Sequence, residues 1–448
     1  MSDATPTCRG AGPGRPTRRA LAWLALLAPF FYASYGLANH LAGMRGSVPS
    51  VVFDWERQVP FWSWTIFPYW SVNVFYGLSL LLARTRHELD RHGARLLTAQ
   101  VVAVGCFIAW PLAFSFGQPA AEGAAGWLFA ALRGFDKPFN QAPSLHIALT
   151  VILWDLYRRR LPPGWPQGLL HLWALAICGS VLTTWQHHFI DLPTGALLGV
   201  LCVWAWPLER RAAMWRIWRT ARDPLRWRLA LRYAVGALLV ALVAQWLGGV
   251  ALWLWWVSVA LLLVALNYAG FGAGGFQMDR GGRMSWPSRW LLAPYRLGAW
   301  ANAWIWTRRQ PPARELLPGV WIGSLARMRN THARRATCVS LCAELQAPTA
   351  LRASCLPWLD LVPASPAALR RAAGQIESAV QRGDAVLVAC ALGFSRSAAA
   401  LACWLTHSGR AADADDAVRR LQQLHPRVTL GEGWREALRR ATQAGATP

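Results

Sequence analysis

Residues 386–399 read Val-Leu-Val-Ala-Cys-Ala-Leu-Gly-Phe-Ser-Arg-Ser-Ala-Ala. The apolar run predicts a buried strand that ends at Cys390, and the small residues from Arg396 onward predict a helix. The backbone N–H groups of the loop between them, the positive end of the helix and the Arg396 guanidinium together form a site for a phosphate group. The same field favours the thiolate of Cys390, so this residue is the candidate nucleophile.

The loop between Cys390 and Arg396 has residue types that suit this role. Gly393 can take the positive φ that a tight turn needs, and Ser397 places a hydroxyl near the sulfur. We expect phosphate to be bound by the loop residues Ala391, Leu392, Gly393, Phe394 and Ser395. The alternative is a buried strand cysteine without a chemical role, which is the usual place of an isolated cysteine. The combination of strand, cysteine, arginine, serine and helix favours the catalytic interpretation.

The sequence around this loop resembles a dual-specificity, cysteine-dependent phosphatase domain. Leu317-Pro-Gly-Val-Trp-Ile-Gly-Ser324 is similar to that family's opening strand, and Cys338-Val-Ser-Leu-Cys-Ala-Glu344 is similar to its second strand. The resemblance implies a three-layer α/β domain with a short, mostly parallel sheet. It also implies a general acid at Asp360, for which loop capping is the alternative role. The family usually has His directly before the nucleophile, where this chain has Ala389.

The chain upstream has the composition of a polytopic membrane protein. Hydrophobic residues make up 54% of the 448 residues, the mean hydropathy is +0.23, and there are 29 Trp. Arginine-rich segments, which hold much of the +24 net charge, follow every second apolar stretch, so these segments and both termini are expected in the cytoplasm. No cleavage site follows the first stretch, which is therefore expected to remain as a helix. The apolar stretches predict eight transmembrane helices, at about residues 20–42, 61–83, 96–116, 144–157, 168–186, 190–207, 233–250 and 251–270.

Cysteine content and charge pattern restrict the other classes of function. The nine cysteines are odd in number and show no C-x-x-C pattern, so we expect free thiols, including Cys390, in the reducing cytosol. Gly, Arg and Trp are abundant between residues 271 and 310, with the Trp residues spaced among Arg residues, which predicts a linker on the membrane surface. Nucleic-acid binding is the other use of such a composition, and the neighbouring transmembrane helix disfavours it.

Two motifs in the membrane half contain ionisable residues. The first is Pro143-Ser-Leu-His146 and the second is His187-His-Phe-Ile-Asp191. Each motif lies at the end of a predicted span, on the outward face. The alternative is that these His and Asp residues only occupy the polar membrane interface and have no catalytic role. The motifs resemble the type 2 phosphatidic acid phosphatase superfamily. The resemblance implies that His187 becomes phosphohistidine, that Asp191 orients it, that His146 protonates the leaving alcohol, and that Ser144 binds phosphate.

This second resemblance is incomplete in its cationic residues. The superfamily motif Lys-x6-Arg-Pro is not intact, and Gln118-Pro119 stands where Arg-Pro is expected. Val181 occupies the position of an Arg six residues before His187. Substrate phosphate still requires a positive charge, and Lys137 is the candidate, with Arg133 nearby.

The order of the segments resembles a bacterial fusion of the two phosphatase types, which implies a bacterial inner-membrane protein. We divide the chain into a cytoplasmic tail (1–19), a six-helix phosphatidic acid phosphatase-like domain (20–208), a basic cytoplasmic loop (209–232), two further transmembrane helices (233–270), the surface linker (271–310) and the phosphatase domain (311–448).

The expected activity is hydrolysis of phosphoric monoesters at two sites. One lies on the outer face and acts on lipid, and the other lies in the cytosol and acts on phosphorylated lipid or protein. The proposed covalent phosphoenzymes imply no metal and no cofactor. The alternatives are a lipid phosphotransferase of the inositol-phosphorylceramide or sphingomyelin synthase kind, and a scaffold with degraded sites. The sequence gives no indication of an oligomeric state.

Overall fold

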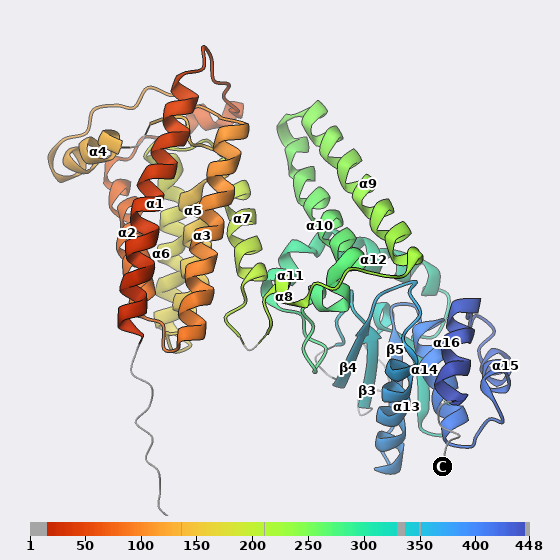
Figure 1. Cartoon of the computed structure of the whole chain (residues 1–448). Coiled ribbons are helices and arrows are strands. Elements are labelled where there is room, and N and C mark those ends of the chain that lie inside the picture. The colour runs from red at the N-terminus through yellow and green to blue at the C-terminus, as the bar shows by residue number, and fades with distance from the viewer. Residues whose placement is uncertain (1–15, 136, 210, 329–336, 349–350, 444–448) are drawn as a thin grey trace, which may run out of the picture. The chain divides into compact units, whose positions relative to one another are not determined.

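The computed structural model describes residues 16–135, 137–209, 211–328, 337–348 and 351–443 (Figure 1). The chain divides into two compact units, Met1–Arg216 and Ile217–Pro448. The first unit holds the motifs at residues 143–146 and 187–191, and the second holds the Cys390 loop.

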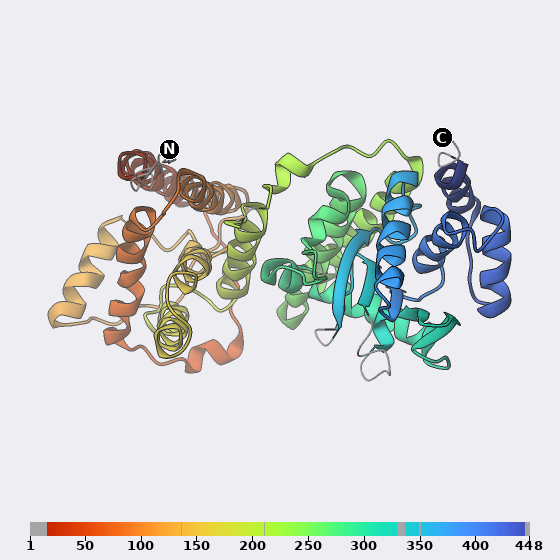
Figure 2. The ribbon, with the colours of Figure 1, turned by 90° about the horizontal axis from the view of Figure 1, so that it is seen from below.

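The first unit is a helical bundle in which α5 packs between α6 and α7, and α1 packs along α3 (Figures 1 and 2). Short 3₁₀ turns, η1 (Asp54–Gln58) and η2 (Ser63–Thr65), precede α2, and α8 (Met214–Ile217) follows the bundle. The helices are α1 (Thr17–Gly43), α2 (Ile66–Leu81), α3 (Arg86–Ala109), α4 (Gly123–Phe135), α5 (Leu145–Arg158), α6 (Trp165–Thr183) and α7 (Asp191–Ala205).

Five helical segments of the described residues are long and apolar enough to cross a membrane: α1, α3, α6, α9 (Pro224–Leu247) and the run Gly249–Phe276. The other three predicted spans correspond to α2, α5 and α7, which have 16, 14 and 15 residues. A span usually needs about 20 residues, so eight crossings remain a prediction. The apolar pattern did not predict α4.

The helix that contains the third predicted span begins ten residues before the span's predicted start at about residue 96. Helix α3 begins at Arg86, where the Thr85 hydroxyl accepts a hydrogen bond from the Glu88 N–H. Its charged first half is tolerated because Arg95 is fully buried and donates to Asp155 of α5 at 2.9 Å. Hydropathy alone counts Arg95 against a transmembrane α3 and Asp155 against a transmembrane α5. The buried ion pair neutralises both charges.

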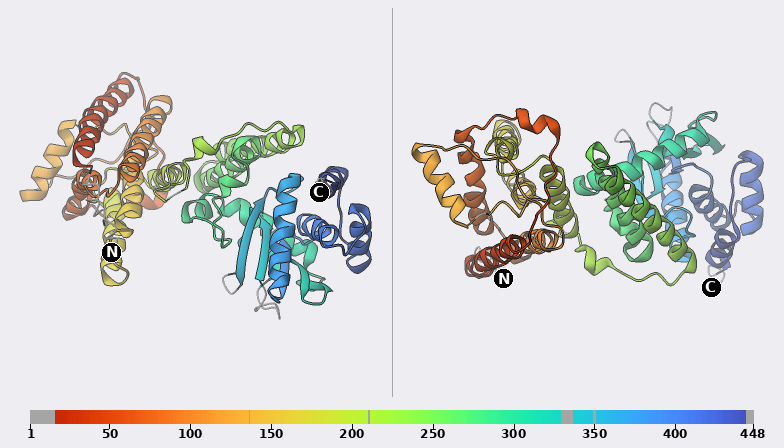
Figure 3. Two further views of the ribbon diagram at one scale, coloured as in Figure 1. Left: turned by 60° about the horizontal axis from the view of Figure 1, so that its bottom comes forward. Right: turned by 90° about the horizontal axis from the view of Figure 1, so that it is seen from above.

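The second unit begins with two antiparallel apolar helices, α9 and α10 (Leu254–Leu266), which lie side by side (Figures 1 and 3). We call this pair the hairpin. It turns at Gly248 and Gly249 through η3 (Gly249–Trp253), and α10 continues into a π-helical turn, η4 (Asn267–Phe271). A 3₁₀ turn, η5 (Gly272–Phe276), and two helices, α11 (Trp286–Leu291) and α12 (Ala293–Thr307), connect it to the sheet.

The sheet has the strand order β1-β2-β5-β3-β4 (Figure 1). Its strands pair in parallel except for β1 and β2, which are antiparallel to each other. The strands are β1 (Ala313–Leu317), β2 (Val320–Ser324), β3 (Thr337–Cys342), β4 (Arg352–Trp358) and β5 (Val386–Cys390), with the 3₁₀ turn η6 (Leu325–Arg327) after β2. The helices that follow are α13 (Pro366–Gln381), α14 (Arg396–His407), α15 (Ala414–Leu424) and α16 (Glu432–Gln443).

Both faces of the central strand β5 are buried, which explains its continuous apolar sequence. Val386 and Val388 pack in the core formed with α13, α14, α15 and α16. Leu387 and Ala389 face the opposite way and pack in a second cluster with Ala303 of α12. The sheet therefore lies between two helical layers, and the loop after β5 begins at its carboxyl edge.

Candidate active sites

Cys390 is the last residue of β5, and its buried sulfur faces the loop that leads to α14. The Gly393 N–H donates to Sγ at 3.1 Å, and the Ser397 Oγ lies 3.4 Å from the same sulfur. Gly393 has a φ of +84°, and a Cβ atom there would lie 3.0 Å from the carbonyl group of Gly323. Only glycine meets both requirements without strain, so this residue sets the turn of the loop.

Hydrogen bonds from outside fix the remaining loop residues. The Ser324 hydroxyl donates to the Ala391 carbonyl at 2.6 Å. The Thr429 N–H donates to the Phe394 carbonyl at 3.1 Å, and the Ser395 hydroxyl donates to the Thr429 carbonyl at 2.8 Å. Leu392 is partly buried against the second cluster. These hydrogen bonds occupy the Ala391 and Phe394 carbonyls, while the Gly393 N–H is directed at the sulfur.

Arg396, the first residue of α14, is buried and held by two carboxylates. Its Nη1 and Nη2 donate to both oxygens of Glu344, at 2.9 and 2.6 Å, and Nη1 also donates to the Trp358 carbonyl at 3.1 Å. Nη2 lies 3.0 Å from Asp360 Oδ1. Burial disfavours the charged form of Glu344, but the adjacent guanidinium outweighs it and lowers the pKa of Glu344.

This arrangement leaves a defined part of Arg396 for a ligand. A guanidinium has five N–H groups, and Glu344 and the Trp358 carbonyl take three of them. A phosphate that enters the loop would use the Nε–H and the Nη2–H that faces Asp360. Glu344 therefore fixes the back of the guanidinium, and its front is directed toward the site.

Asp360 follows β4, and its side chain is 43% exposed. Partial burial, with a smaller contribution from the Glu344 carboxylate, raises the pKa of Asp360 against the opposing effect of Arg396. A carboxyl group with a raised pKa keeps its proton to higher pH, which is the property of a general acid. The Tyr268 hydroxyl donates to the Asp360 carbonyl at 3.0 Å and fixes the loop that carries it.

In the first unit, the two histidine-containing motifs meet. His187 Nδ1 lies 3.0 Å from Asp191 Oδ2, and His187 Nε2 lies 3.3 Å from the Ser144 hydroxyl. The Ser144 N–H donates to the Asp191 carbonyl at 3.2 Å. Gly195 allows this approach, because a Cβ atom there would overlap the Ser144 carbonyl oxygen. Glycine in α7 thus brings the start of α5 against His187 and Asp191.

His146 and His187 line one cavity of about 240 Å³. The His146 ring stacks on Tyr69 with 3.9 Å between ring centroids, and its Nε2 lies 2.8 Å from the Tyr69 carbonyl oxygen. The described lining contains no Lys or Arg. Helices α1 and α2 contribute aromatic side chains to it, namely Phe31, Tyr32, Tyr35, Tyr69, Trp70 and Tyr76.

The structure does not place the predicted cation in this cavity. Lys137 is exposed and lies outside the described lining. Arg133 donates to the Gln118 side chain at 3.4 Å. Val181 is fully buried, and its carbonyl accepts the His187 N–H at 3.1 Å. The position where the resemblance expects Arg therefore supports the His187 turn through its backbone.

Two buried carboxylates had no role assigned from the sequence. Glu344 holds Arg396, and Glu56 lies 2.9 Å from Nδ1 of His188, the neighbour of the predicted nucleophile. Both pairings join segments far apart in the chain, so no local spacing signals them. Within the described ranges, no three His, Cys, Asp or Glu side chains are grouped to hold a metal ion.

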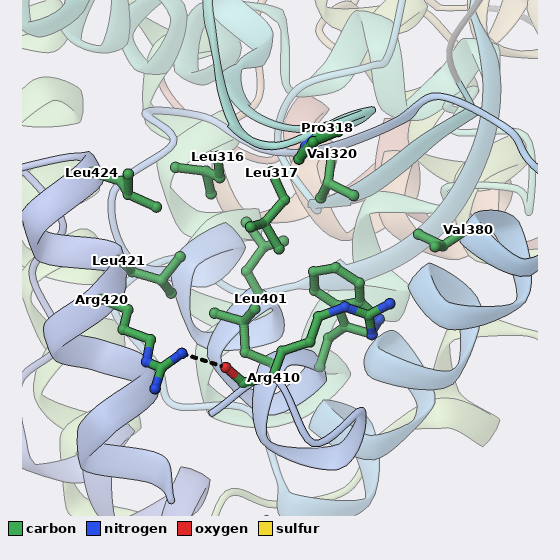
Figure 4. A pocket seen from close by; sticks show the side chains of 12 residues that line it. Leu316, Leu317, Pro318, Val320, Val380, Leu401, Arg410, Arg420, Leu421 and Leu424 are labelled. Carbon is green, nitrogen blue, oxygen red and sulfur yellow. Dashed lines mark hydrogen bonds between the residues drawn. The ribbon is translucent and has the colours of Figure 1, made fainter. Parts of the chain in front are cut away.

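A separate pocket of about 520 Å³ lies in the second unit (Figure 4). Leucine side chains from β1, α14 and α15 line it, with Arg410 and Arg420 at its polar side. The Arg420 guanidinium donates to the Arg410 carbonyl at 2.7 Å. None of the Cys390 loop residues is among its described lining, so the larger pocket is distinct from the candidate active site.

Comparison with known proteins gave no matching family model. A mouse putative dual specificity phosphatase complexed with zinc tungstate is 24% identical with a TM-score of 0.28, covering 30% of this chain and 89% of that one. Human DUSP28 is 24% identical with a TM-score of 0.27, covering 31% and 97%. PTPMT1 in complex with PI(5)P is 14% identical with a TM-score of 0.27, covering 30% and 96%. The chain is thus similar, over about 30% of its length, to dual-specificity and tyrosine phosphatase-like domains.

Proposed function

We propose that the second unit is a cysteine-dependent phosphomonoester hydrolase. Cys390 is the nucleophile, Arg396 binds the phosphate and Asp360 is the general acid. One observation supports this most strongly: the loop directs the Gly393 N–H at the Cys390 sulfur while Asp360 lies 3.0 Å from the Arg396 guanidinium. A nucleophile, an anion-binding group and a proton donor are thus held at one place.

The reaction proceeds in two steps. The Cys390 thiolate attacks phosphorus, the S–P bond forms as the ester P–O bond breaks, and protonated Asp360 gives its proton to the leaving oxygen. Water then attacks phosphorus, Asp360 takes a proton from it, and the S–P bond breaks to release inorganic phosphate. Ser397 stabilises the departing thiolate, because its hydroxyl lies 3.4 Å from the sulfur.

Turnover of a soluble aryl phosphate by the full chain in detergent tests this proposal. All proteins carry His187→Ala so that the first unit does not contribute. Cys390→Ser abolishes turnover, and Asp360→Asn lowers it about 10²-fold. Cys403→Ser, a change at another buried cysteine of the same unit, leaves turnover unchanged. Undiminished activity of Cys390→Ser, or no activity in any form, refutes the proposal, and the latter result favours a scaffold.

For the first unit we propose a second hydrolase that acts on a lipid phosphate through phosphohistidine. His187 attacks phosphorus, Asp191 orients its ring, Ser144 contacts the phosphate and His146 protonates the leaving alcohol. The aromatic cavity beside both histidines supports a substrate with an apolar part. Lys137 is proposed to contribute positive charge to phosphate binding. Assay of phosphate release with and without added lipid alcohol separates hydrolysis from phosphotransfer, since only a transferase phosphorylates the alcohol.

A further inference from the structure

The general-acid loop of the second unit is attached to the hairpin. The Tyr268 hydroxyl, in the turn η4 that continues α10, donates to the Asp360 carbonyl at 3.0 Å. Tyr268 stacks on Tyr233 of α9 with 5.5 Å between ring centroids, and Tyr233 contacts Tyr295 of α12 edge to face. The catalytic side of the sheet is therefore joined to two apolar helices through three tyrosines.

Further hydrogen bonds fix the same region. The Cys355 N–H of β4 donates to the Arg280 carbonyl at 2.9 Å. The Arg296 guanidinium donates to the Glu344 carbonyl at 3.3 Å, beside the group that holds Arg396. The segment that follows the hairpin, through Arg280 and Arg296, is thus hydrogen-bonded to β4 and to the residue that holds Arg396.

The charges on α9 mark where this helix meets the membrane surface. Arg226, Arg228 and Arg232 lie in its first nine residues, whereas the fifteen residues from Tyr233 to Leu247 carry no charge. A charged side chain in the hydrocarbon is costly, and tyrosine is enriched at the membrane interface, so the hydrocarbon begins near Tyr233. The Asp360 loop contacts Tyr268, which stacks on Tyr233, and this loop therefore lies at the headgroup layer.

The exposed surface near the junction has the properties of a lipid contact. Leu361, directly after Asp360, is 61% exposed and has a φ of +59°. This conformation is unfavourable for leucine, and it directs an apolar side chain away from the core. Exposed arginines in residues 217–296, which attract anionic lipid, are Arg219, Arg222, Arg228, Arg232, Arg280, Arg283 and Arg289.

We infer that the Cys390 site acts on a phosphomonoester carried by a lipid of the membrane that holds the hairpin. This inference rests on the proposed cysteine chemistry and specifies its substrate class. A lipid headgroup lies at the height of Asp360, and Leu361 contacts the acyl boundary beside it. A phosphoprotein would have to bring a folded surface down to the same layer.

Turnover by the full chain carrying His187→Ala, reconstituted in phosphatidylcholine vesicles, tests the inference. Phosphatidate or phosphatidylglycerol phosphate is placed either in the same vesicles or in separate, protein-free vesicles. A phosphotyrosine peptide and an aryl phosphate are supplied in solution. We expect lipid hydrolysis only when the lipid and the protein share one bilayer. We also expect this lipid to be hydrolysed faster than the phosphotyrosine peptide.

Two variants sharpen the result. Leu361→Gly, which suits the positive φ, and Leu361→Asp lower the ratio of lipid to aryl phosphate turnover about tenfold, because burial of one leucine contributes about one decade in binding. The control Leu424→Ala, at another exposed leucine of the same unit, leaves the ratio unchanged.

Faster peptide turnover, equal lipid turnover from separate vesicles, or an unchanged ratio in both Leu361 variants overturns the inference. Aryl phosphate turnover that depends on Cys390 would still stand in these cases. Loss of that dependence refutes the proposed function itself.

Discussion

Replacing Glu344 by Gln tests how the phosphate-binding arginine is held. Glu344 accepts two hydrogen bonds from Arg396, at 2.9 and 2.6 Å, and the two side chains are 4% and 3% exposed. Gln keeps the shape and one acceptor oxygen but removes the negative charge. The Arg396 guanidinium is then left with Asp360 as its one charged partner among those described, and it is free to rotate toward that carboxylate.

The size of the effect follows from the burial of the pair. Loss of one partner from a buried ion pair costs about 3–5 kcal/mol, because the remaining charge is uncompensated. Asp360 still lies 3.0 Å from the guanidinium, so we expect the lower end, about 3 kcal/mol. A domain with an unfolding free energy of about 5–15 kcal/mol stays folded after this loss. Misplacement of Arg396 lowers kcat/KM for aryl phosphate about 10²-fold.

Pulse proteolysis of the full chain in urea, followed through a C-terminal tag, measures the change in unfolding free energy. The control is Glu436→Gln, because Glu436 is 49% exposed and pairs with Arg440 on the surface of α16 at 2.7 Å. We expect this control to change stability by less than about 0.5 kcal/mol and to leave turnover intact. If Glu344→Gln behaves like Glu436→Gln in both assays, the assigned role of Glu344 is refuted.

Three further predictions concern pH and the first unit. Asp360 must be protonated to act as acid and its pKa is raised, so kcat falls as pH rises through that value; Asp360→Asn lacks this limb. The pKa of Glu344 in the folded protein is lowered, so the contribution of Glu344 to the unfolding free energy is fully present above about pH 4.3 and is lost as pH falls through the folded pKa. Measuring the unfolding free energy at decreasing pH checks this expectation. His187→Ala abolishes phosphatidate hydrolysis without changing aryl phosphate turnover, whereas His171→Ala, at a histidine bonded to Trp154, changes neither.

The local features of the second unit could be predicted because they are encoded in consecutive residues. The apolar run and the small residues after it agree with the observed limits of β5, at Cys390, and of α14, at Arg396. The positive φ of Gly393 follows from the same short stretch. The motifs of the first unit likewise meet because Gly195 follows Asp191 by one helical turn.

Long-range contacts account for what the sequence did not reveal. The buried partner of Arg396 comes from the end of β3, which the strand order β1-β2-β5-β3-β4 brings beside β5. Ala389, where the family resemblance expects His, packs in one cluster with Ala303 of α12. A fragment that begins at residue 311 lacks that helix, so the activity tests use the full chain. The hydrogen bond from Tyr268 to the acid loop has no local sequence signal either.

The covalent intermediate provides the direct measurement of the proposed chemistry. The full chain carrying His187→Ala is mixed with substrate, quenched in acid within one turnover and digested with a protease. The mass of the peptide that contains Cys390 is then measured by mass spectrometry. We predict one phosphoryl group on the Cys390 sulfur, absent from Cys390→Ser. Continued turnover with phosphate on another residue, or with an unmodified Cys390 under conditions that trap the intermediate, would contradict the assignment of Cys390 as the nucleophile.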